Sequence, residues 1–442
     1  MSSLHQAISH KTLWERFGSL SYQDLPGDVR TLAAQCILDW FACALAGSRE
    51  PLADILRAEF ADVAGPCAVV GTAMRTSPTV AALINGATSH ALDFDDTSTV
   101  MGGHPTVPVF PAVLALAEER GASGTDLITA LVVGAEVEGR LGSAIGGKHY
   151  ARGWHVTSTM GVFGAAAGAS HLLGLNAHQF GYAMGLAASQ ASGLKANFGT
   201  MTKPFHAGHA AERGLLSARL AARGYTSNPE AFAAPQGLVE AAGTGAIDED
   251  RLANVDGEWL IRHTLFKYHA ACYLTHAAIE SALRLRGAVA VENLAAATVT
   301  VHPSLLDVCG IPQPQTGLEA KFSLTGTTAM ALLGMDTTDP ATFVDALVQG
   351  EALQRLIRRV RIENDRNLRQ TQAVVEFEDK AQRLFRAEHD SGVPASDLAA
   401  QGARLHDKFL GVAGIALGDG AGMFEQKLQT LPAVADVRSA LS

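Results

Sequence analysis

The segment HALDFDDTSTVMGGH (residues 90–104) gathers ionisable side chains that could carry out chemistry. Asp93, Asp95 and Asp96 fall within four positions, and His104 follows after two threonines and a pair of glycines. Carboxylates and an imidazole can cap a turn, hold a cation or transfer protons. The segment therefore leaves three interpretations open: a solvated turn, a hard-metal site and an acid–base site.

Two specialised interpretations of this segment find little support elsewhere in the chain. A DxDDT motif can act as the acid of class II terpene cyclases, but those enzymes need a large aromatic cavity, and only 6% of the residues are aromatic. A metal site could combine Asp93, Asp95, Asp96 and His104 with His206 and His209. However, the spacing of these residues matches no compact metal signature, and HEXXH and EF-hand patterns are absent.

Composition narrows the function classes further. GxGxxG, P-loop and GxSxG patterns are absent, so nucleotide cofactors and serine-esterase chemistry are not indicated. The net charge of −10, without a long basic run, argues against nucleic acid or an anionic membrane as a partner. The five cysteines are widely spaced and include no CxxC pair, so we expect buried or unreactive thiols rather than a disulfide framework. An anionic substrate would need a local island of positive charge.

Three further segments place Lys, His and Tyr among small residues beside predicted helix starts. They are GGKHYARGWHVTST (146–159), GLKANFGTMTKPFHAGHAAERG (193–214) and FKYHAACYLTH (266–276). Because Lys203 precedes Pro204, it is predicted to be extended, just before a helix whose first-turn amides could face an anion. The side chains that could form the positive island are Lys203, His155, His206, Lys267, His269 and Lys321.

The pattern of elements predicts two domains. From about residue 28 to 265, small-residue-rich segments with helical periodicity end at Gly and open near Ser, Thr, Asp or Asn, which predicts a helical domain. Residues 296–304, 358–365 and 372–380 alternate apolar and polar side chains like half-buried strands, with helical stretches between them. We therefore predict a mainly α protein: a helical domain over 1–265, a smaller α+β domain over 266–397, and a helical segment over 398–442 that returns to the first domain.

The hydropathy of the sequence indicates where in the cell the protein is expected. The first residues lack a secretory pattern, and no stretch reaches about 18 unbroken apolar residues. We expect a soluble, cytoplasmic protein.

Taken together, these segments resemble the MmgE/PrpD family, which includes 2-methylcitrate dehydratases, cis-aconitate decarboxylases and iminodisuccinate epimerases. The resemblance rests on the order and spacing of HALDFDDTSTVMGGHP, GWHVTSTMGVFGAAAGAS, GLKANFGTMTKPFHAGHAAERGLLSA, FKYHAACYLTHAAIE and KFSLTGTTAMALL. It implies a helical domain built from N- and C-terminal parts, an inserted α+β domain, and a homodimer. It also implies action on small di- or tricarboxylates without a metal or organic cofactor.

Carried onto this sequence, the resemblance implies roles for Asp93, Thr97, His104, His155 and Lys203. Taking a proton from carbon beside a carboxylate creates a dianionic enediolate-like state, which needs a placed base and cations aimed at the developing charge. A desolvated Lys203 flanked by other cations could be base or acid, and His104 and His155 could make the complementary proton transfer. Asp93 would orient a histidine or lysine, and Thr97 would hydrogen-bond a substrate carboxylate.

Other residues complete the expected site. Tyr150 is a second candidate acid, able to protonate the opposite face in an epimerisation. The candidates for substrate binding besides Thr97 are His206, Lys267, His269 and Lys321. Leu324, Thr325 and Gly326 follow KFS where dehydratase and decarboxylase relatives often carry an aromatic residue, and FKYHAACYLTH lacks the prolines common in dehydratases. We therefore predict a lyase that dehydrates or decarboxylates a polycarboxylate, with an epimerase of a substrate such as iminodisuccinate, or a non-catalytic carboxylate-binding member, as alternatives.

Overall fold

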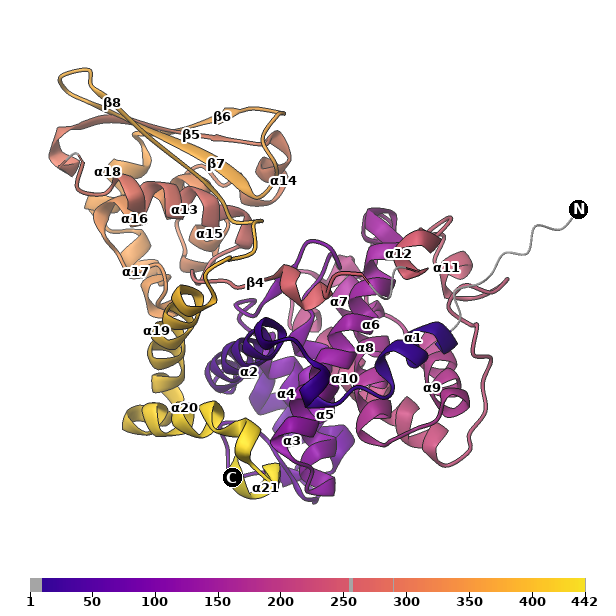
Figure 1. Cartoon of the computed structure of the whole chain (residues 1–442). Helices are drawn as coiled ribbons and strands as arrows, with labels where there is room; N and C mark the ends of the chain where they lie inside the picture. The colour runs from indigo at the N-terminus through magenta and orange to yellow at the C-terminus, as the bar shows by residue number, and fades with distance from the viewer. Residues whose placement is uncertain (1–9, 254–256, 289, 442) are drawn as a thin grey trace, which may run out of the picture. The chain divides into compact units, whose positions relative to one another are not determined.

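The computed structural model describes residues 10–253, 257–288 and 290–441. The chain divides into two units (Figure 1): unit 1 is Met1–Phe266 with Ser396–Ser442, and unit 2 is Lys267–Ala395. The sequence prediction placed the boundaries at 265/266 and 397/398. The predicted fold class, mainly α with a smaller α+β part, is confirmed.

Unit 1 consists of helices and two short strand pairs. Its helices are α1 (His10–Phe17), α2 (Gly27–Gly47), α3 (Pro51–Glu59), α4 (Pro78–Ser89), α5 (Thr106–Arg120), α6 (Gly124–Ala151), α7 (Val156–Thr159), α8 (Gly161–Leu172), α9 (Ala177–Gln190), α10 (Thr202–Ala222), α11 (Leu238–Ala241), α12 (Glu249–Ala253), α19 (Leu398–Leu417), α20 (Ala421–Gln429) and α21 (Val437–Ala440). The strands β1 (Cys67–Ala68) and β2 (Arg75–Thr76) pair antiparallel, as do β3 (Thr97–Ser98) and β4 (Thr264–Leu265).

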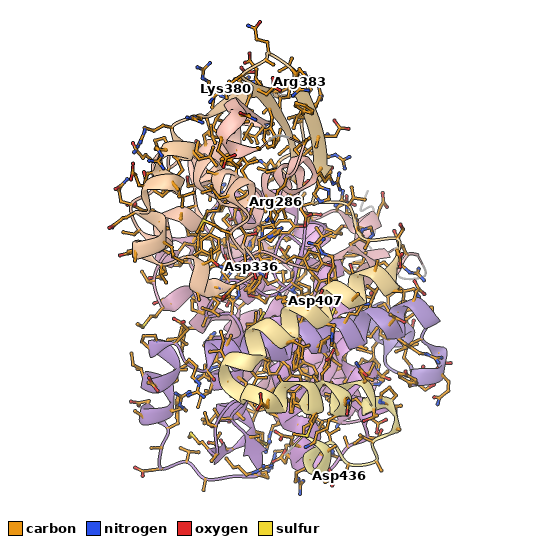
Figure 2. The ribbon with its side chains drawn as sticks, turned by 90° about the vertical axis from the view of Figure 1, so that its left-hand side faces the viewer. Arg286, Asp336, Lys380, Arg383, Asp407 and Asp436 are labelled. Carbon is orange, nitrogen blue, oxygen red and sulfur yellow. The ribbon has the colours of Figure 1, made fainter. Side chains whose placement is uncertain are left out.

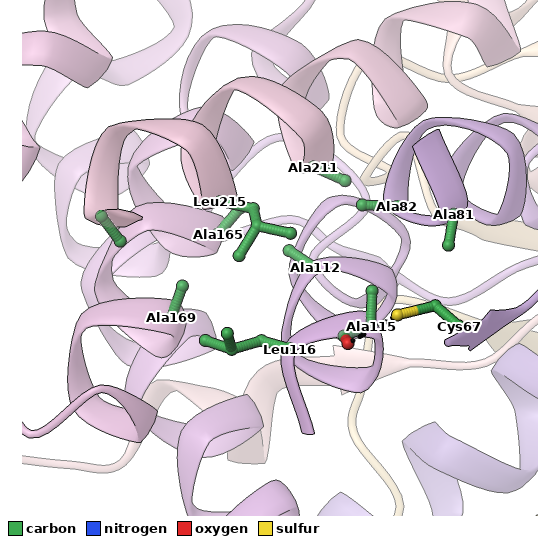
Figure 3. Packing of buried hydrophobic residues seen from close by; sticks show 11 residues of the cluster. Cys67, Ala81, Ala82, Ala112, Ala115, Leu116, Ala165, Ala169, Ala211 and Leu215 are labelled. Atoms are coloured by element: carbon green, nitrogen blue, oxygen red, sulfur yellow. Dashed lines mark hydrogen bonds between the residues drawn. The ribbon is translucent and has the colours of Figure 1, made fainter. Parts of the chain in front are cut away.

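Small residues let the central helices of unit 1 approach closely. Figure 3 shows an alanine-rich cluster in which the Cys67 thiol donates to the Ala115 carbonyl at 3.1 Å. A Cβ added to Gly86 on α4 would lie 2.7 Å from the Cα of Gly208 on α10, so neither position tolerates a side chain. Glycine lowers helix propensity by about 1 kcal/mol, and the close packing offsets this cost. The contact brings the loop after α4 beside the start of α10. The cluster comprises Cys67, Ala81, Ala82, Ala112, Ala115, Leu116, Ala165, Ala169, Ala211, Leu215 and Ala218.

The C-terminal segment contributes α19, which packs on α2. Lys408 on α19 is buried; its Nζ lies 2.5 Å from Asp39 Oδ1 on α2 and donates to the Phe94 carbonyl at 2.7 Å. The neighbouring Asp407 lies on the exposed face of α19 (Figure 2). Within the described residues, α2 is the one helix long and apolar enough to cross a membrane, and 78% of its most apolar window is buried inside the structure. The hydrogen bond from Lys408 to the Phe94 carbonyl thus ties the DFDDT loop to the last part of the chain.

Unit 2 is a four-stranded sheet covered on one face by helices (Figure 1). The strand order is β6-β5-β7-β8, with β5 parallel to β6 and the other neighbours antiparallel. Its strands are β5 (Leu294–Val301), β6 (Val360–Asn364), β7 (Gln372–Asp379) and β8 (Leu384–Asp390). Its helices are α13 (Tyr273–Leu285), α14 (Leu306–Cys309), α15 (Gly317–Lys321), α16 (Leu324–Leu333), α17 (Asp345–Val348) and α18 (Glu351–Ile357).

Three of these strands match the predicted segments within a few residues, but β8 was not predicted. Its sequence, LFRAEHD, has few apolar residues, because it is an edge strand with no fully buried position. Lys380 and Arg383 stand at the turn that joins it to β7 (Figure 2).

Candidate active site

The loop after α4 holds the first part of the candidate site. His90 is fully buried at the end of α4, and Asp93 adopts a left-handed backbone conformation with φ of 51°. This conformation is uncommon for a residue with a side chain, although Asp tolerates it better than most. The chain therefore turns sharply between His90 and Asp95.

Asp95 lies at the centre of a buried hydrogen-bonded group. Its Oδ1 is 2.8 Å from His90 Nδ1, and its Oδ2 is 2.8 Å from His104 Nδ1, which also lies 2.7 Å from the Asp96 carbonyl oxygen. Since a carbonyl oxygen only accepts, Nδ1 of His104 carries the proton. Burial raises the pKa of the Asp95 carboxyl, but His90 and then His104 outweigh burial and hold that pKa well below its usual range.

Lys203 joins this group through Asp93. The Lys203 ammonium donates to Asp93 Oδ1 at 2.8 Å, and His104 Nε2 lies 3.6 Å from the same oxygen. A continuous path of ionisable groups therefore runs from Lys203 through Asp93, His104 and Asp95 to His90. The expectation that Lys203 would be flanked by cations differs from the structure, in which its nearest charge is a carboxylate.

The backbone of Lys203 also differs from the expectation. The sequence predicts an extended residue before the helix, but α10 begins at Thr202 and Lys203 occupies its first turn. Pro204 is tolerated there because the first N–H groups of a helix need no intrahelical acceptor.

Asp96 lies beside Asp95 and differs from it electrostatically. Its Oδ2 accepts a hydrogen bond from the Thr106 hydroxyl, and its Oδ1 accepts from the Thr106 backbone N–H at 3.3 Å. Burial, followed by the nearby Asp39, raises the pKa of Asp96 to about 8. At neutral pH, Asp96 is protonated while Asp95 is ionised.

His155 and His206 form the other side of the cluster. Their Nδ1 atoms are 3.2 Å apart, so one ring donates and the other accepts, and His155 stacks on His90 with ring centroids 5.9 Å apart. Burial, and behind it the neighbouring His90 and Lys203, holds the pKa of His155 well below its usual range; burial also lowers the pKa of His206. Both rings are therefore neutral at pH 7, contrary to their expected part in a positive island.

Comparison with known proteins identifies the family of this chain. The MmgE/PrpD N-terminal domain matches residues 13–249, and the MmgE/PrpD C-terminal domain matches residues 269–426. The chain belongs to the MmgE/PrpD family. Of the five residues of unit 1 to which the family resemblance assigns roles, Asp93, His104, His155 and Lys203 lie in the cluster or contact it.

The curated relatives are cis-aconitate decarboxylases. The enzyme of Aspergillus terreus is 32% identical over 292 residues, which is 61% of this chain and 58% of the relative. The Homo sapiens enzyme is 31% identical over 313 residues, 66% of this chain and 62% of the relative. A cis-aconitate decarboxylase-like protein, oryM, of Aspergillus oryzae is 33% identical over 285 residues, 60% of this chain and 59% of the relative. The chain thus spans about three fifths of the length of the relatives it matches.

Two other predicted residues of unit 1 have contacts of their own. Thr97 begins β3, and its hydroxyl donates to the Gly103 carbonyl at 3.2 Å. Tyr150, near the end of α6, is 41% exposed, and the Lys195 ammonium lies 3.4 Å from its ring centroid. The contacts described for Tyr150 join it to Lys195 rather than to the aspartates.

The remaining predicted residues lie in unit 2. Lys267 is buried, and Lys321 ends α15 with its Nζ 5.8 Å from the Phe343 ring centroid. Both ring nitrogens of His269 have partners, since Nδ1 lies 2.8 Å from Thr337 Oγ1 and Nε2 lies 3.2 Å from Glu280 Oε1. His269 is thus held within unit 2 by its own neighbours.

Sequence reasoning missed His90 as a site residue, and it weighed Asp95 as part of a turn, a metal site or an acid motif without including it among the predicted catalytic residues. Both stand in the conspicuous segment 90–104, so the composition of that segment was the available signal. His90 Nε2 is buried without a hydrogen-bond partner in the described structure. Such a nitrogen is costly to bury and is available to a ligand or a proton.

A metal ion could in principle be held by this group. One ligand atom from each of His90, Asp93, Asp95 and His104 lies within 4.8 Å of the others. The Nδ1 atoms of His90 and His104 are already at hydrogen-bonding distance from Asp95, so an ion bound through these two nitrogens would have to displace the protons that they carry.

Proposed function

We propose that the chain is a cofactor-independent lyase that acts on a small polycarboxylate, with decarboxylation of cis-aconitate as the first activity to test. One observation carries the proposal: the path of ionisable groups from Lys203 through Asp93, His104 and Asp95 to His90. The family and the cis-aconitate decarboxylase relatives support a lyase as the reaction class. The group contains an ammonium, carboxylates and imidazoles that lie close to one another.

Asp95 would position His90, and the Asp96 carbonyl oxygen would position His104. Asp95 Oδ1 accepts from His90 Nδ1 and the Asp96 carbonyl accepts from His104 Nδ1, so in the neutral form of each ring the lone pair lies on Nε2. Burial, against the pull of Asp95, lowers the pKa of His90 to about 4, so this ring is neutral at pH 7. Neutral imidazoles of this kind can accept a proton from carbon, or return one after the neighbouring bond breaks.

Lys203 would stabilise the charge that develops on substrate. Loss of carbon dioxide or of a proton beside a carboxylate leaves negative charge on that carboxylate, and a placed ammonium lowers its energy. The side chain of Lys203 is 16% exposed, and its partner Asp93 is 36% exposed, so a substrate carboxylate can reach the pair from solvent. Substrate would then compete with Asp93 for the ammonium.

The test is proton NMR of the purified protein in deuterated water with cis-aconitate, 2-methylcitrate and single enantiomers of iminodisuccinate. We expect cis-aconitate to lose carbon dioxide and to give an unsaturated dicarboxylate that contains deuterium. A new vinyl signal from 2-methylcitrate would keep the lyase and change its leaving group to water. Deuterium at the α-carbon of iminodisuccinate, with loss of optical activity and no vinyl signal, would replace the lyase by an epimerase.

If no compound in this panel reacts, calorimetric titration with the same carboxylates tests the non-catalytic alternative. A homodimer in the cytoplasm belongs to the same proposal, and sedimentation equilibrium of the purified chain tests the dimer.

A further inference from the structure

Two cysteines of unit 2 that are distant in sequence meet in the fold. Cys272 is the residue before α13, and Cys309 ends α14. Their side chains form a hydrogen bond with each other. Four of the five cysteines are buried, as expected, but Cys272 is half-buried. The sequence-based expectation of unreactive thiols therefore needs revision at this pair.

The backbone holds the pair together independently of the side chains. The Cys272 N–H donates to the Lys321 carbonyl at 2.9 Å, and Gly310, directly after Cys309, forms an antiparallel bridge with Ser323. Both cysteines are thus anchored to the short segment 321–323. The Ser323 hydroxyl also donates to the Ile311 carbonyl at 2.7 Å, which fixes the chain on the far side of Cys309. The same short segment therefore holds the backbone at Cys272 and the residue directly after Cys309.

The two thiols differ in access and ionisation. Cys272 is reachable from solvent, whereas Cys309 is 1% exposed. Cys309 nevertheless lines a cavity of about 450 Å³, together with Ile311, Leu324 and Val360. The hydrogen bond to Cys272, and then burial, raise the pKa of the Cys309 thiol far above its usual range. Cys272 is therefore the thiol that a small oxidant meets first, and Cys309 is the one that follows.

We propose that Cys272 and Cys309 form a redox pair that a peroxide converts to an intrachain disulfide. In the first step, the Cys272 sulfur attacks one peroxide oxygen, the O–O bond breaks, and Cys272 becomes a sulfenic acid as one water leaves. In the second step, the Cys309 sulfur attacks the Cys272 sulfur, the S–O bond breaks, and the second water leaves with the Cys309 proton. The two thiols lose two electrons in total, and hydrogen peroxide accepts them.

The bond would fix the start of α13. Cys272 closes the segment that carries Lys267 and His269, so a disulfide to α14 would restrain that segment as well. The inference stands on the contacts of unit 2 and does not depend on the function proposed for unit 1.

Trypsin makes the test unambiguous. Cleavage after Lys267, Arg284, Arg286 and Lys321 leaves Cys272 in peptide 268–284 and Cys309 in peptide 287–321, with one cysteine in each. The purified full chain is treated with hydrogen peroxide, remaining thiols are blocked with iodoacetamide, and the digest is analysed by mass spectrometry without reductant. We expect one major cross-linked species that joins these two peptides and disappears on treatment with dithiothreitol.

Variants separate the two steps. Cys309→Ser should abolish the cross-link and leave a sulfenic acid at Cys272 that dimedone traps, whereas Cys272→Ser should abolish both. Cys67→Ser is the matched control, because Cys67 is a buried thiol whose hydrogen bond to the Ala115 carbonyl serine can retain, and it should form the cross-link normally. If Cys309→Ser fails to fold, as judged by circular dichroism, Cys309→Ala replaces it.

Two results on the wild-type chain would each contradict the proposed redox pair. In the first, peptides 268–284 and 287–321 remain unlinked while Cys272 is oxidised to sulfinic acid. In the second, the cross-links join cysteines of two different chains.

Discussion

The histidines of the two units differ in what their ring nitrogens contact. In unit 2, His269 uses both nitrogens on Thr337 and Glu280, and His276 approaches the Ala271 carbonyl with Nε2. In unit 1, His90 uses Nδ1 on Asp95, while its buried Nε2 has no hydrogen-bond partner in the described structure. The comparison teaches that residue type and burial do not mark a chemical role, whereas an uncommitted nitrogen beside a charged network does.

Two neighbouring carboxyl groups of unit 1 also differ from each other. Adjacent Asp95 and Asp96 have pKa values displaced in opposite directions, one well below its usual range and one at about 8. Environments that split neighbouring titratable groups in this way are typical of acid–base sites. At Asp95, burial is outweighed by His90 and then by His104, whereas at Asp96 burial and then Asp39 outweigh the hydrogen bonds from Thr106.

The largest effect is expected from Lys203→Ala. The substitution removes the ammonium aimed at the developing charge, and kcat/KM on the reactive substrate should fall by about 10³-fold or more. Lys195→Ala is the matched control, because Lys195 lies in the same connecting segment but contacts Tyr150, and it should change kcat/KM by less than about threefold. Full activity in a folded Lys203→Ala protein would remove this residue from the mechanism.

A smaller loss, of about 10²-fold in kcat, is expected for Asp95→Asn. The amide no longer requires a proton on His90 Nδ1, so the tautomer of His90 is no longer fixed, and the negative charge 2.8 Å from His104 Nδ1 is lost. Asp96→Asn should keep at least about a third of the activity, because an amide resembles the protonated acid already present there. The measurement is kcat of both variants in stopped assays at pH 7. Equal losses would mean that the two carboxyls do not differ in the way proposed.

The substitution His→Asn, made once in each unit, tests the histidine comparison directly. Asparagine retains a donor near the Nδ1 position and lacks Nε2. His90→Asn should therefore lower kcat by about 10-fold to 10²-fold with little change in urea stability. His269→Asn should instead lose about 1–3 kcal/mol of stability, because the contact between the His269 Nε2 and Glu280 is lost, with a smaller change in kcat. The reverse pattern would assign the chemistry to unit 2.

Local patterns in the sequence were enough to predict the fold class. Caps and glycine stops marked the helices, and alternation marked β5, β6 and β7 to within a few residues of their ends. The edge strand β8 was missed because its sequence, LFRAEHD, has few apolar residues and no fully buried position. The salt bridge between Asp93 and Lys203, which are 110 positions apart, could not be predicted from spacing. It depends on the contact of Gly86 with Gly208, which is a property of packing.

The sequence predicted which residues form the candidate site better than it predicted their charges. The residues Asp93, His104, His155, His206 and Lys203 were singled out by their types, and the structure brings them together. Their charges follow from burial, which a sequence does not state. His155 and His206 were expected to be positive, yet desolvation keeps them neutral.

The smallest effect concerns stability rather than turnover. The pKa of Asp96 is about 8 in the folded chain and about 3.8 in an unfolded one. Between these values the folded state keeps a proton that the unfolded state releases, so the free energy of unfolding contributed by Asp96 falls as pH rises, by at most about 1.4 kcal/mol per pH unit. Above pH 8 it becomes constant. Asp96→Asn should therefore gain stability relative to wild type by about 1–3 kcal/mol between pH 5.5 and 7.5 in urea unfolding. Asp407→Asn, at an exposed position on α19, should show no such trend, and a constant difference between wild type and Asp96→Asn would mean that Asp96 is ionised in the folded protein.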